Sequence, residues 1–295
     1  MIRELEVIKK HACNVPGSFL EGNLKCVFKK NASVKTVKIR FFGTEFANVK
    51  LTNEVLFNMD NDVCYAETVL VNESSVPEGV NTYPFKLKIP QHIPSSYISE
   101  YGGIRYILEG SIMMSNSKIT KICKSIEIFS PIDLKSFDDS LNKKETFSSE
   151  KELMGLCGVG GLVTTKINVD RRIFLCGDVI NLNAVIHNLS GITVRKINAY
   201  LMKSDSCRLQ DGGCAVGRNH VIAKQKCSTS VSRNEEKTYQ LSIKVPENVM
   251  IPNLNNSKFF KTKHWIHVNI HFNHFWRRPI IIIFKVYIGH IPLNI

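Results

Sequence analysis

The chain has 295 residues, of which 22% are charged and 43% are hydrophobic. This length predicts about two domains, and the composition is that of a globular protein, not of a disordered chain. It excludes a collagen, a coiled coil, a mucin-like stalk and a small disulfide-stapled scaffold, but it excludes no class of enzyme. The motifs along the chain therefore have to indicate the function.

The net charge is +13, and it is spread unevenly along the chain. Residues 1–145 carry 19 basic and 17 acidic side chains, whereas residues 146–295 carry 20 basic and 9 acidic ones. An electropositive second half favours an acidic partner, which can be nucleic acid, anionic lipid, or a phosphorylated or acidic peptide. A solvated basic surface without a dedicated partner also accounts for the charge.

Nine cysteines are scattered along the sequence without any C-x-x-C pair, and the N-terminus has no signal-peptide pattern. Together these features predict reduced thiols in a cytosolic protein. The longest apolar run, residues 280–284, is much shorter than the roughly 18 residues that a membrane-spanning helix needs.

The dominant pattern is the alternation of apolar and polar residues, which is typical of half-buried strands. In chain order, the alternating runs lie at residues 34–42, 85–89, 104–108, 112–114, 126–128, 163–169, 180–186, 241–245 and 266–272. Turn-forming residues separate these runs, and we expect no helix of about twelve residues or more. The sequence thus predicts an all-β protein built from sandwiches or barrels.

A polar segment at residues 134–151 predicts a linker between two domains. The expected N-terminal domain spans residues 1–133 and the expected C-terminal domain spans residues 152–295. Both begin alike, because Pro16-Gly17 and Cys176-Gly177-Asp178 each place a turn before a strand-like run. This suggests two copies of one topology.

Five motifs follow one another in a fixed order along nearly the whole chain. They are Pro16-Gly17-x4-Gly22, the block of short motifs between Val76 and Tyr106, Ile132-Asp133-Leu134, Cys176-Gly177-Asp178 and the run Ile288 to Pro292. The block contains Val-Pro-Glu-Gly, Tyr-Pro-Phe, Ile-Pro, Pro-Ser-Ser-Tyr and Gly-Ile-Arg-Tyr. In order and spacing these motifs resemble those of the arrestins, and in particular of the α-arrestins, or arrestin-domain-containing proteins. Ser18 stands where that family has an acidic residue.

The resemblance implies two tandem arrestin-type, immunoglobulin-like β-sandwiches in a non-catalytic adaptor. Such an adaptor binds cytosolic tails of membrane-protein cargo and links them to endocytosis, endosomal protein transport and ubiquitin-dependent sorting. It works in the cytoplasm, peripherally at the plasma membrane and endosomes, together with other arrestin-like proteins and, indirectly, a ubiquitin ligase. The alternative is a structural subunit of a sorting coat, similar to the arrestin-like subunit of retromer.

Lysines provide the candidate binding residues for phosphate or acidic cargo. Lys9 and Lys10 resemble the first-strand lysine pair with which visual and β-arrestins contact receptor phosphates. Lys25, Lys29 and Lys30 begin a basic run, free of acids, that continues to residue 40 and suits an acidic tail or an anionic membrane. The alternative for both groups is a solvated basic face that protects a strand edge.

Four histidines, at positions 264, 267, 271 and 274, would form one stripe on a helix and could then bind Zn²⁺. The alternation of residues 266–272 instead predicts a strand, which places these histidines on opposite faces and too far apart for one metal ion. We therefore expect no metal site.

The remaining motifs predict no catalytic site. The glycines between residues 158 and 161 lack the lysine and the spacing of a nucleotide-binding loop. Cys207 and Cys214 flank a short loop and are expected to be free thiols. Since no catalytic signature and no nucleic-acid-binding motif is present, we expect neither an enzyme, nor a cofactor, nor a nucleic-acid partner.

The sequence makes one prediction about partners that can be tested directly. α-Arrestins usually carry P-P-x-Y motifs, which bind the grooves of WW domains as polyproline helices. Residues 1–295 contain no Pro-Pro pair, so we expect them to show no direct binding to isolated WW domains of ubiquitin ligases in a pull-down. Micromolar binding of this polypeptide would contradict the prediction.

Overall fold

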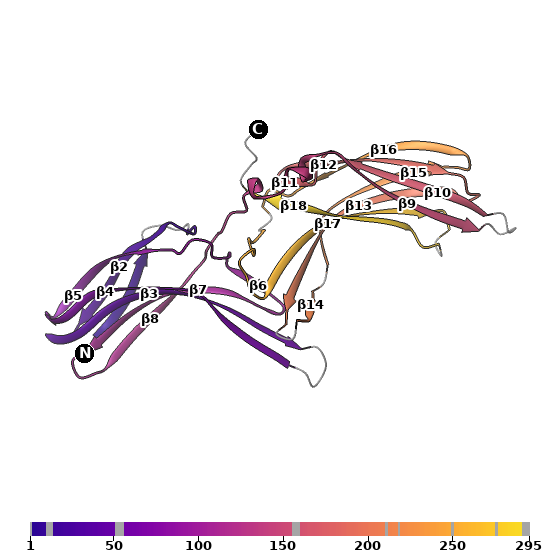
Figure 1. Cartoon of the computed structure of the whole chain (residues 1–295). Coiled ribbons are helices and arrows are strands. Elements are labelled where there is room, and N and C mark those ends of the chain that lie inside the picture. The colour runs from indigo at the N-terminus through magenta and orange to yellow at the C-terminus, as the bar shows by residue number, and fades with distance from the viewer. Residues whose placement is uncertain are drawn as a thin grey trace. The chain divides into compact units, whose positions relative to one another are not determined.

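The structure is a computed structural model, and it describes residues 2–9, 14–50, 56–154, 160–209, 212–217, 219–248, 251–274 and 277–290. The described residues form strands, two short 3₁₀ helices and loops, with no α-helix among them, which confirms the predicted all-β class. The chain divides into two compact units (Figure 1). Unit 1 consists of Met1–Pro131, Ser206–Ala215 and Pro252–Lys261, and unit 2 of Ile132–Asp205, Val216–Ile251 and Thr262–Ile295.

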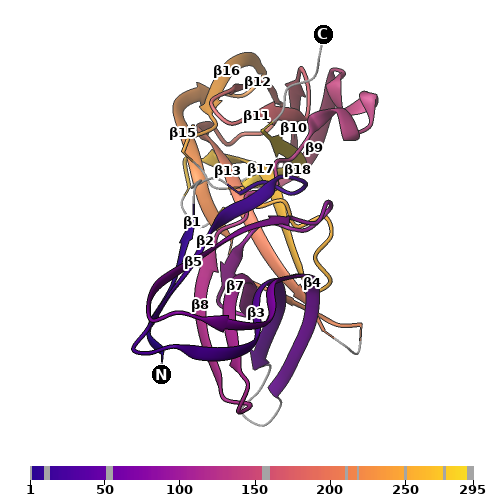
Figure 2. The ribbon, with the colours of Figure 1, turned by 90° about the vertical axis from the view of Figure 1, so that its left-hand side faces the viewer.

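Unit 1 is a sandwich of two antiparallel sheets, whose strands are labelled in Figures 1 and 2. The smaller sheet has the order β1-β2-β5, with β1 at Ile2–Lys9, β2 at Phe19–Phe28 and β5 at Gly79–Lys88. The larger sheet has the order β4-β3-β7-β6, and β8 also pairs with β7. Its strands are β3 (Ala32–Lys50), β4 (Leu56–Val76), β6 (Tyr97–Ser99), β7 (Gly102–Met114) and β8 (Ile119–Ile126).

Unit 2 repeats this two-sheet architecture. One sheet has the order β16-β12-β10-β9, with β9 at Glu145–Met154, β10 at Gly160–Val169, β12 at Val179–Asn188 and β16 at Glu235–Lys244. The other has the order β11-β18-β17-β13-β14, and β15 also pairs with β13. Its strands are β11 (Ile173–Leu175), β13 (Val194–Arg208), β14 (Cys214–Val216), β15 (His220–Val231), β17 (Phe260–Phe272) and β18 (Ile280–Gly289). Most of β14 and the adjoining ends of β13 and β17 are counted with unit 1.

The two units share one strand order. In unit 1 the strands pair as β1-β2-β5 and β4-β3-β7-β8, and in unit 2 as β10-β12-β16 and β15-β13-β17-β18, with the strands taken in the same sequence order. The turns that lead into β2 and β12 are also alike. Gly17 donates to the carbonyl of Ile89 and Gly177 to that of Val245, each at 3.0 Å, and both glycines have positive φ. A side chain at either glycine would strain the turn, which explains why both motifs contain Gly at this point.

Alternation along each strand divides its side chains between core and solvent. In β3, Val37, Ile39 and Phe41 are fully buried, while Lys38 and Arg40 between them point away from the core. In β12, Ile180 and Leu182 are buried beside exposed Asn181. Each unit has a core cluster of its own that lies between its two sheets. The period of two therefore fixes which residues are available for binding on each outer face.

The segment expected to be a linker, residues 134–151, contains regular structure. It holds two 3₁₀ helices, η1 (Leu134–Ser136) and η2 (Asp139–Asn142), and then most of β9. Strand β9 pairs with β10 along its whole length at the edge of the sheet, and Leu134 and Leu141 are buried in a small cluster of unit 2. An edge strand with alternating Thr, Ser and Glu side chains buries little, so its composition is that of a linker.

A buried carboxylate fixes a distant part of the chain to unit 1. Glu45, on β3, has no exposed surface. Its carboxylate accepts hydrogen bonds from the Ser257 hydroxyl and from the backbone N–H groups of Lys258, Phe259 and Phe260, at 3.0, 2.8 and 3.3 Å for the three amides. A buried charge is tolerated when donors saturate it, and here four donors do so. Phe259 and Phe260 themselves belong to the core of unit 1.

Replacing this carboxylate should destabilise unit 1 in a graded way. Glu45→Ala removes the acceptor of the Lys258 and Phe259 N–H groups and of the Ser257 hydroxyl, whereas the Phe260 N–H keeps Ser257 Oγ at 2.7 Å, so we expect a loss of about 3 kcal/mol in the free energy of unfolding. Glu45→Gln keeps an acceptor but loses the charge, and should cost roughly half as much. Urea unfolding measures the loss, and hydrogen exchange at the amides of residues 258–260 localises it.

Glu78→Ala, at an exposed glutamate of unit 1, is the matched control and should leave the unfolding midpoint unchanged. Equal losses for Glu45→Ala and Glu45→Gln would contradict a dominant role for the charge. Unchanged exchange at residues 258–260 in either variant would contradict the anchoring role.

Candidate functional site

The first-strand lysines lie at the end of β1. Lys9 is the last residue of β1, and its backbone is paired with that of Gly22 on β2. Lys10 lies outside the described residues. The strand placement agrees with the predicted strand, and the phosphate-binding role of the pair stays a prediction.

Lys25 lies on the outward side of β2, half-buried, directly opposite Glu6 on β1. On the same face of β2, four residues before Lys25, Glu21 forms an ion pair with Lys86 at 2.7 Å. Carboxylates next to lysines lower the positive potential of the face and compete with an incoming phosphate. The outer face of this sheet therefore has mixed charge.

The other basic residues of the predicted run are not gathered on one face. Lys29 and Lys30 are both exposed in the turn that follows β2, and they are the two residues of the run that lie side by side in the chain. On β3, Lys38 pairs with Glu67 at 2.9 Å, and Arg40 hydrogen-bonds the carboxylate of Glu109. Lys35 on β3 is also exposed, so the accessible positive charge of this run lies at Lys29, Lys30 and Lys35.

The histidine set lies on a strand, as predicted, and not on a helix. In β17, His264 is buried with the core residues, whereas His267 and His271 point to the opposite face. His274 follows the strand. Among the residues that the structure describes, no group of three or more His, Cys, Asp or Glu side chains is placed to hold a metal ion.

Cys26, Cys207 and Cys214 are free thiols. Burial raises the pKa of Cys207 to about 11 and that of Cys26 to about 12, so both thiols stay protonated at neutral pH. Cys214 is exposed and also free. Of the glycine motif, Gly160 and Gly161 open β10, and residues 155–159 lie outside the described residues.

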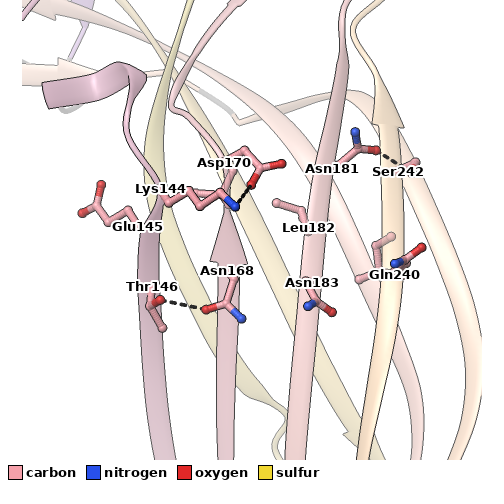
Figure 3. A pocket seen from close by; sticks show the side chains of 12 residues that line it. Lys144, Glu145, Thr146, Asn168, Asp170, Asn181, Leu182, Asn183, Gln240 and Ser242 are labelled. Atoms are coloured by element: carbon pink, nitrogen blue, oxygen red, sulfur yellow. Dashed lines mark hydrogen bonds and ion pairs between the residues drawn. The ribbon is translucent and has the colours of Figure 1, made fainter. Parts of the chain in front are cut away.

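One cavity was not predicted from the sequence. It has a volume of about 530 Å³ and lies in unit 2 over the first residues of β9 and β12 and the last residues of β10 and β16 (Figure 3). Thr146, Asn168, Asn183 and Gln240 follow one another in register across these four strands. Thr146 donates to the amide oxygen of Asn168 at 2.7 Å, and a second row of side chains lies beside the first.

The chemistry of this cavity is that of neutral hydrogen bonding. In the second row, Ser242 donates to Asn181 at 2.9 Å, and Lys144 lies 3.7 Å from Asp170. Glu145, on the rim, is paired with Arg172 at 2.6 Å. The carboxylates of Asp170 and Glu145 are thus each paired with a cationic side chain. The amide side chains donate and accept hydrogen bonds but do not transfer protons. The arrangement suits contact with a polar ligand better than acid–base catalysis.

Each strand of the cavity shows polar residues at alternate positions in the sequence, for example Asn181 and Asn183. Alternation alone indicates that such side chains are exposed. It does not tell which strands are neighbours or in what register, and those two facts bring the four amide and hydroxyl side chains into one row.

No helix in the described part of the chain combines the length and the apolar character needed to cross a lipid bilayer.

Comparison with known proteins identifies both halves of the chain. A model of the N-terminal domain of arrestin (or S-antigen) matches residues 4–135, and a model of the C-terminal domain of arrestin matches residues 160–293. Arrestin domain-containing protein 1 of Mus musculus is 24% identical over 192 residues, which are 65% of this chain and 44% of the relative. Arrestin domain-containing protein 5 of Bos taurus is 20% identical over 207 residues, 67% of this chain and 62% of the relative. The matched part thus spans less than half the length of the mouse relative.

The buried histidine predicts a pH dependence of stability. Burial and the charge of Lys203 lower the pKa of His264 from 6.5 to about 4, against the opposing effect of Asp205. The unfolded chain binds a proton near pH 6.5 and the folded chain does not, so stability is complete above that pH and falls as the pH drops toward 4. The loss amounts to about 3 kcal/mol. His264→Phe should remove this part of the dependence when urea unfolding is compared at about pH 7 and about pH 4.5.

His267→Phe is the matched comparison on the opposite face of the same strand: burial lowers the pKa of His267 less strongly than that of His264, so this variant should remove a smaller part of the dependence. An unchanged pH dependence in His264→Phe would show that other groups cause the loss of stability in acid.

Proposed function

The chain belongs to the arrestin family, with arrestin-domain-containing proteins as its relatives, and from this premise we propose that it is a non-catalytic adaptor for the cytosolic tails of membrane proteins. The adaptor works in the cytoplasm, peripherally at the plasma membrane and endosomes. It links cargo to endocytosis, endosomal protein transport and ubiquitin-dependent sorting, with a ubiquitin ligase brought in through another arrestin-like protein. The match of both arrestin domain models, at residues 4–135 and 160–293, carries the proposal.

The outer faces of the sheets support an adaptor. They present rows of polar and charged side chains on rigid strands, which is the geometry in which a flexible tail can be contacted at several points at once. The cavity on β9, β10, β12 and β16 adds amide groups that match the hydrogen-bonding groups of a peptide backbone.

We assign the phosphate or acidic groups of the tail to the lysines of unit 1. Lys9 ends β1 and is followed in the sequence by Lys10, and Lys29 and Lys30 are adjacent in the turn after β2. Lys25 lies between them in sequence and faces Glu6, so its contribution is smaller. Adjacent ammonium groups can hold a phosphate from two sides, and a phosphate carries close to two negative charges at neutral pH.

Removing the first pair should therefore distinguish phosphorylated tails from unphosphorylated ones. Lys9→Ala with Lys10→Ala should weaken binding of a phosphorylated tail peptide by about fivefold for each lost phosphate contact, and change binding of the unphosphorylated peptide little. Fluorescence anisotropy with the two forms of one peptide measures the difference.

The matched control is Lys135→Ala with Lys143→Ala, two exposed lysines of unit 2 that do not line the cavity. Equal weakening of both peptide forms by the Lys9 and Lys10 substitutions would indicate general charge attraction. No binding of either form to the unaltered chain would contradict the adaptor proposal.

A further inference from the structure

The positive charge of unit 2 is concentrated on one of its two sheets. Within unit 2, strands β13, β15, β17 and β18 carry seven Lys or Arg residues and one acidic residue, Asp205. Strands β9, β10, β12 and β16 of the other sheet carry four basic and five acidic residues. The excess charge of the second half of the chain therefore has a definite place in the fold.

The corresponding face of unit 1 is neutralised by its own ion pairs. There, Lys38 pairs with Glu67 on the neighbouring strand, and Glu109 on β7 receives both Arg40 and Lys121. The strands involved, β4, β3, β7 and β8, have the same order as β15, β13, β17 and β18. The same strand order thus gives a face in unit 1 whose basic side chains pair with carboxylates of the same sheet, and a basic face in unit 2.

The basic face contains lysines without ion pairs. Lys224 and Lys226 are exposed on β15, directly opposite Tyr200 and Asn198 of β13. Of the described side chains on this face, no carboxylate pairs with Lys196, Lys224 or Lys226, and Asp205 is paired with Lys203 at 3.0 Å. These lysines remain available to a partner.

Apolar side chains lie at the other side of the same face. Ile281 and Ile283 on β18 are 50% and 51% exposed, although Ile282 between them is buried in the core. They stand opposite Asn269 and His267 of β17. Two half-exposed isoleucines at alternate positions on one face of a strand can anchor an apolar partner.

Recessed amides occupy the middle of the face. Asn198 is only 4% exposed, and its side-chain nitrogen lies 3.1 Å from Nε2 of His271. The side-chain oxygens of Asn198 and Asn269 are buried without a hydrogen-bond partner in the described part of the chain. A buried acceptor requires a donor. The N–H groups of a peptide backbone supply such donors at regular spacing once the two amide side chains rotate to the surface, whereas a lipid headgroup offers at most one ammonium group.

We infer that the outer face of β18, β17, β13 and β15 is a docking surface for an acidic peptide that also carries aliphatic residues. Lys224 and Lys226 bind its carboxylates, Ile281 and Ile283 contact its aliphatic side chains, and the amides of Asn198 and Asn269 bind its backbone. The four strands span about 14 Å, which an extended peptide covers in about four residues. The inference rests on the proposed adaptor function only for the source of the peptide.

The test uses the whole chain and a fluorescent peptide in which two leucines precede a run of glutamates by about four residues. The same peptide with Gln in place of Glu is the matched probe. Lys224→Glu with Lys226→Glu should weaken binding of the Glu peptide at least about tenfold and flatten its salt dependence. Ile281→Ser with Ile283→Ser should weaken binding by about the same factor and leave the salt dependence unchanged.

Lys166→Glu with Lys244→Glu, at two exposed lysines of the other sheet, gives the same change in net charge and should change binding less than about twofold. Circular dichroism confirms that each variant keeps its strands. Equal losses in both lysine variants would overturn the inference, because general charge would then explain the binding.

Vesicles of phosphatidylserine and phosphatidylcholine test the bilayer as the partner. If the unaltered chain binds these vesicles through Lys224 and Lys226 and does not bind the Glu peptide, the face is a membrane surface and the inference is overturned. Absence of both kinds of binding also overturns it. If the Glu peptide binds as expected while phosphorylated tails do not bind the chain at all, the docking surface stands and the adaptor proposal fails.

Discussion

The hydrogen bonds of the Glu45 carboxylate determine which segments of the chain belong to unit 1. It joins β3 to Ser257 across 212 residues of sequence and supplies acceptors to a segment that would otherwise bury its N–H groups unpaired. Because Phe259 and Phe260 beside it enter the core, the hydrophobic cluster of unit 1 is completed by residues from the second half of the chain. Unit 1 is therefore not one continuous stretch of sequence. The carboxylate of Glu45 holds residues 257–260 against β3.

The same backbone topology carries two different electrostatic faces. In unit 1, residues directly across β3 alternate in sign, since Arg40 stands between Glu67 on β4 and Glu109 on β7. In unit 2, Asn198 stands between Lys226 on β15 and His271 on β17. Burial lowers the pKa of His271, with Lys196 adding to the effect, so the ring is neutral at physiological pH. Cross-strand partners, more than net charge, decide whether a lysine remains available for binding.

The alternating pattern predicted the strands that bury one clean face, such as β3, β10, β12 and β17, and it predicted that the histidines of β17 divide between two faces. It missed β4, β9 and β15, which lie at sheet edges and bury few side chains completely, so that their sequences carry little apolar period. It also missed the interior strands β13 and β18, because β13 buries three consecutive residues, Ile197 to Ala199, and the first half of β18 is apolar on both faces. The repeated turn at Gly17 and Gly177 was visible because positive φ restricts the residue type. The candidate sites were harder to predict, since pairing partners such as Glu6 opposite Lys25 come from strand register, which a single sequence does not contain.

This difference also explains why adjacency in sequence was a poor guide to a binding surface. The basic run between Lys25 and Arg40 is continuous in the chain, yet it is divided between two strands and a turn, and Lys38 and Arg40 meet carboxylates on β4 and β7. The basic face of unit 2 is scattered over some ninety residues of sequence, from Lys196 to Lys285, and is assembled only by the order β18-β17-β13 and the pairing of β15 with β13. In an antiparallel sandwich, residues that lie side by side on one face are separated in sequence by whole strands. A surplus of basic residues therefore indicates a binding surface only when the sheet order shows which carboxylates lie next to those residues.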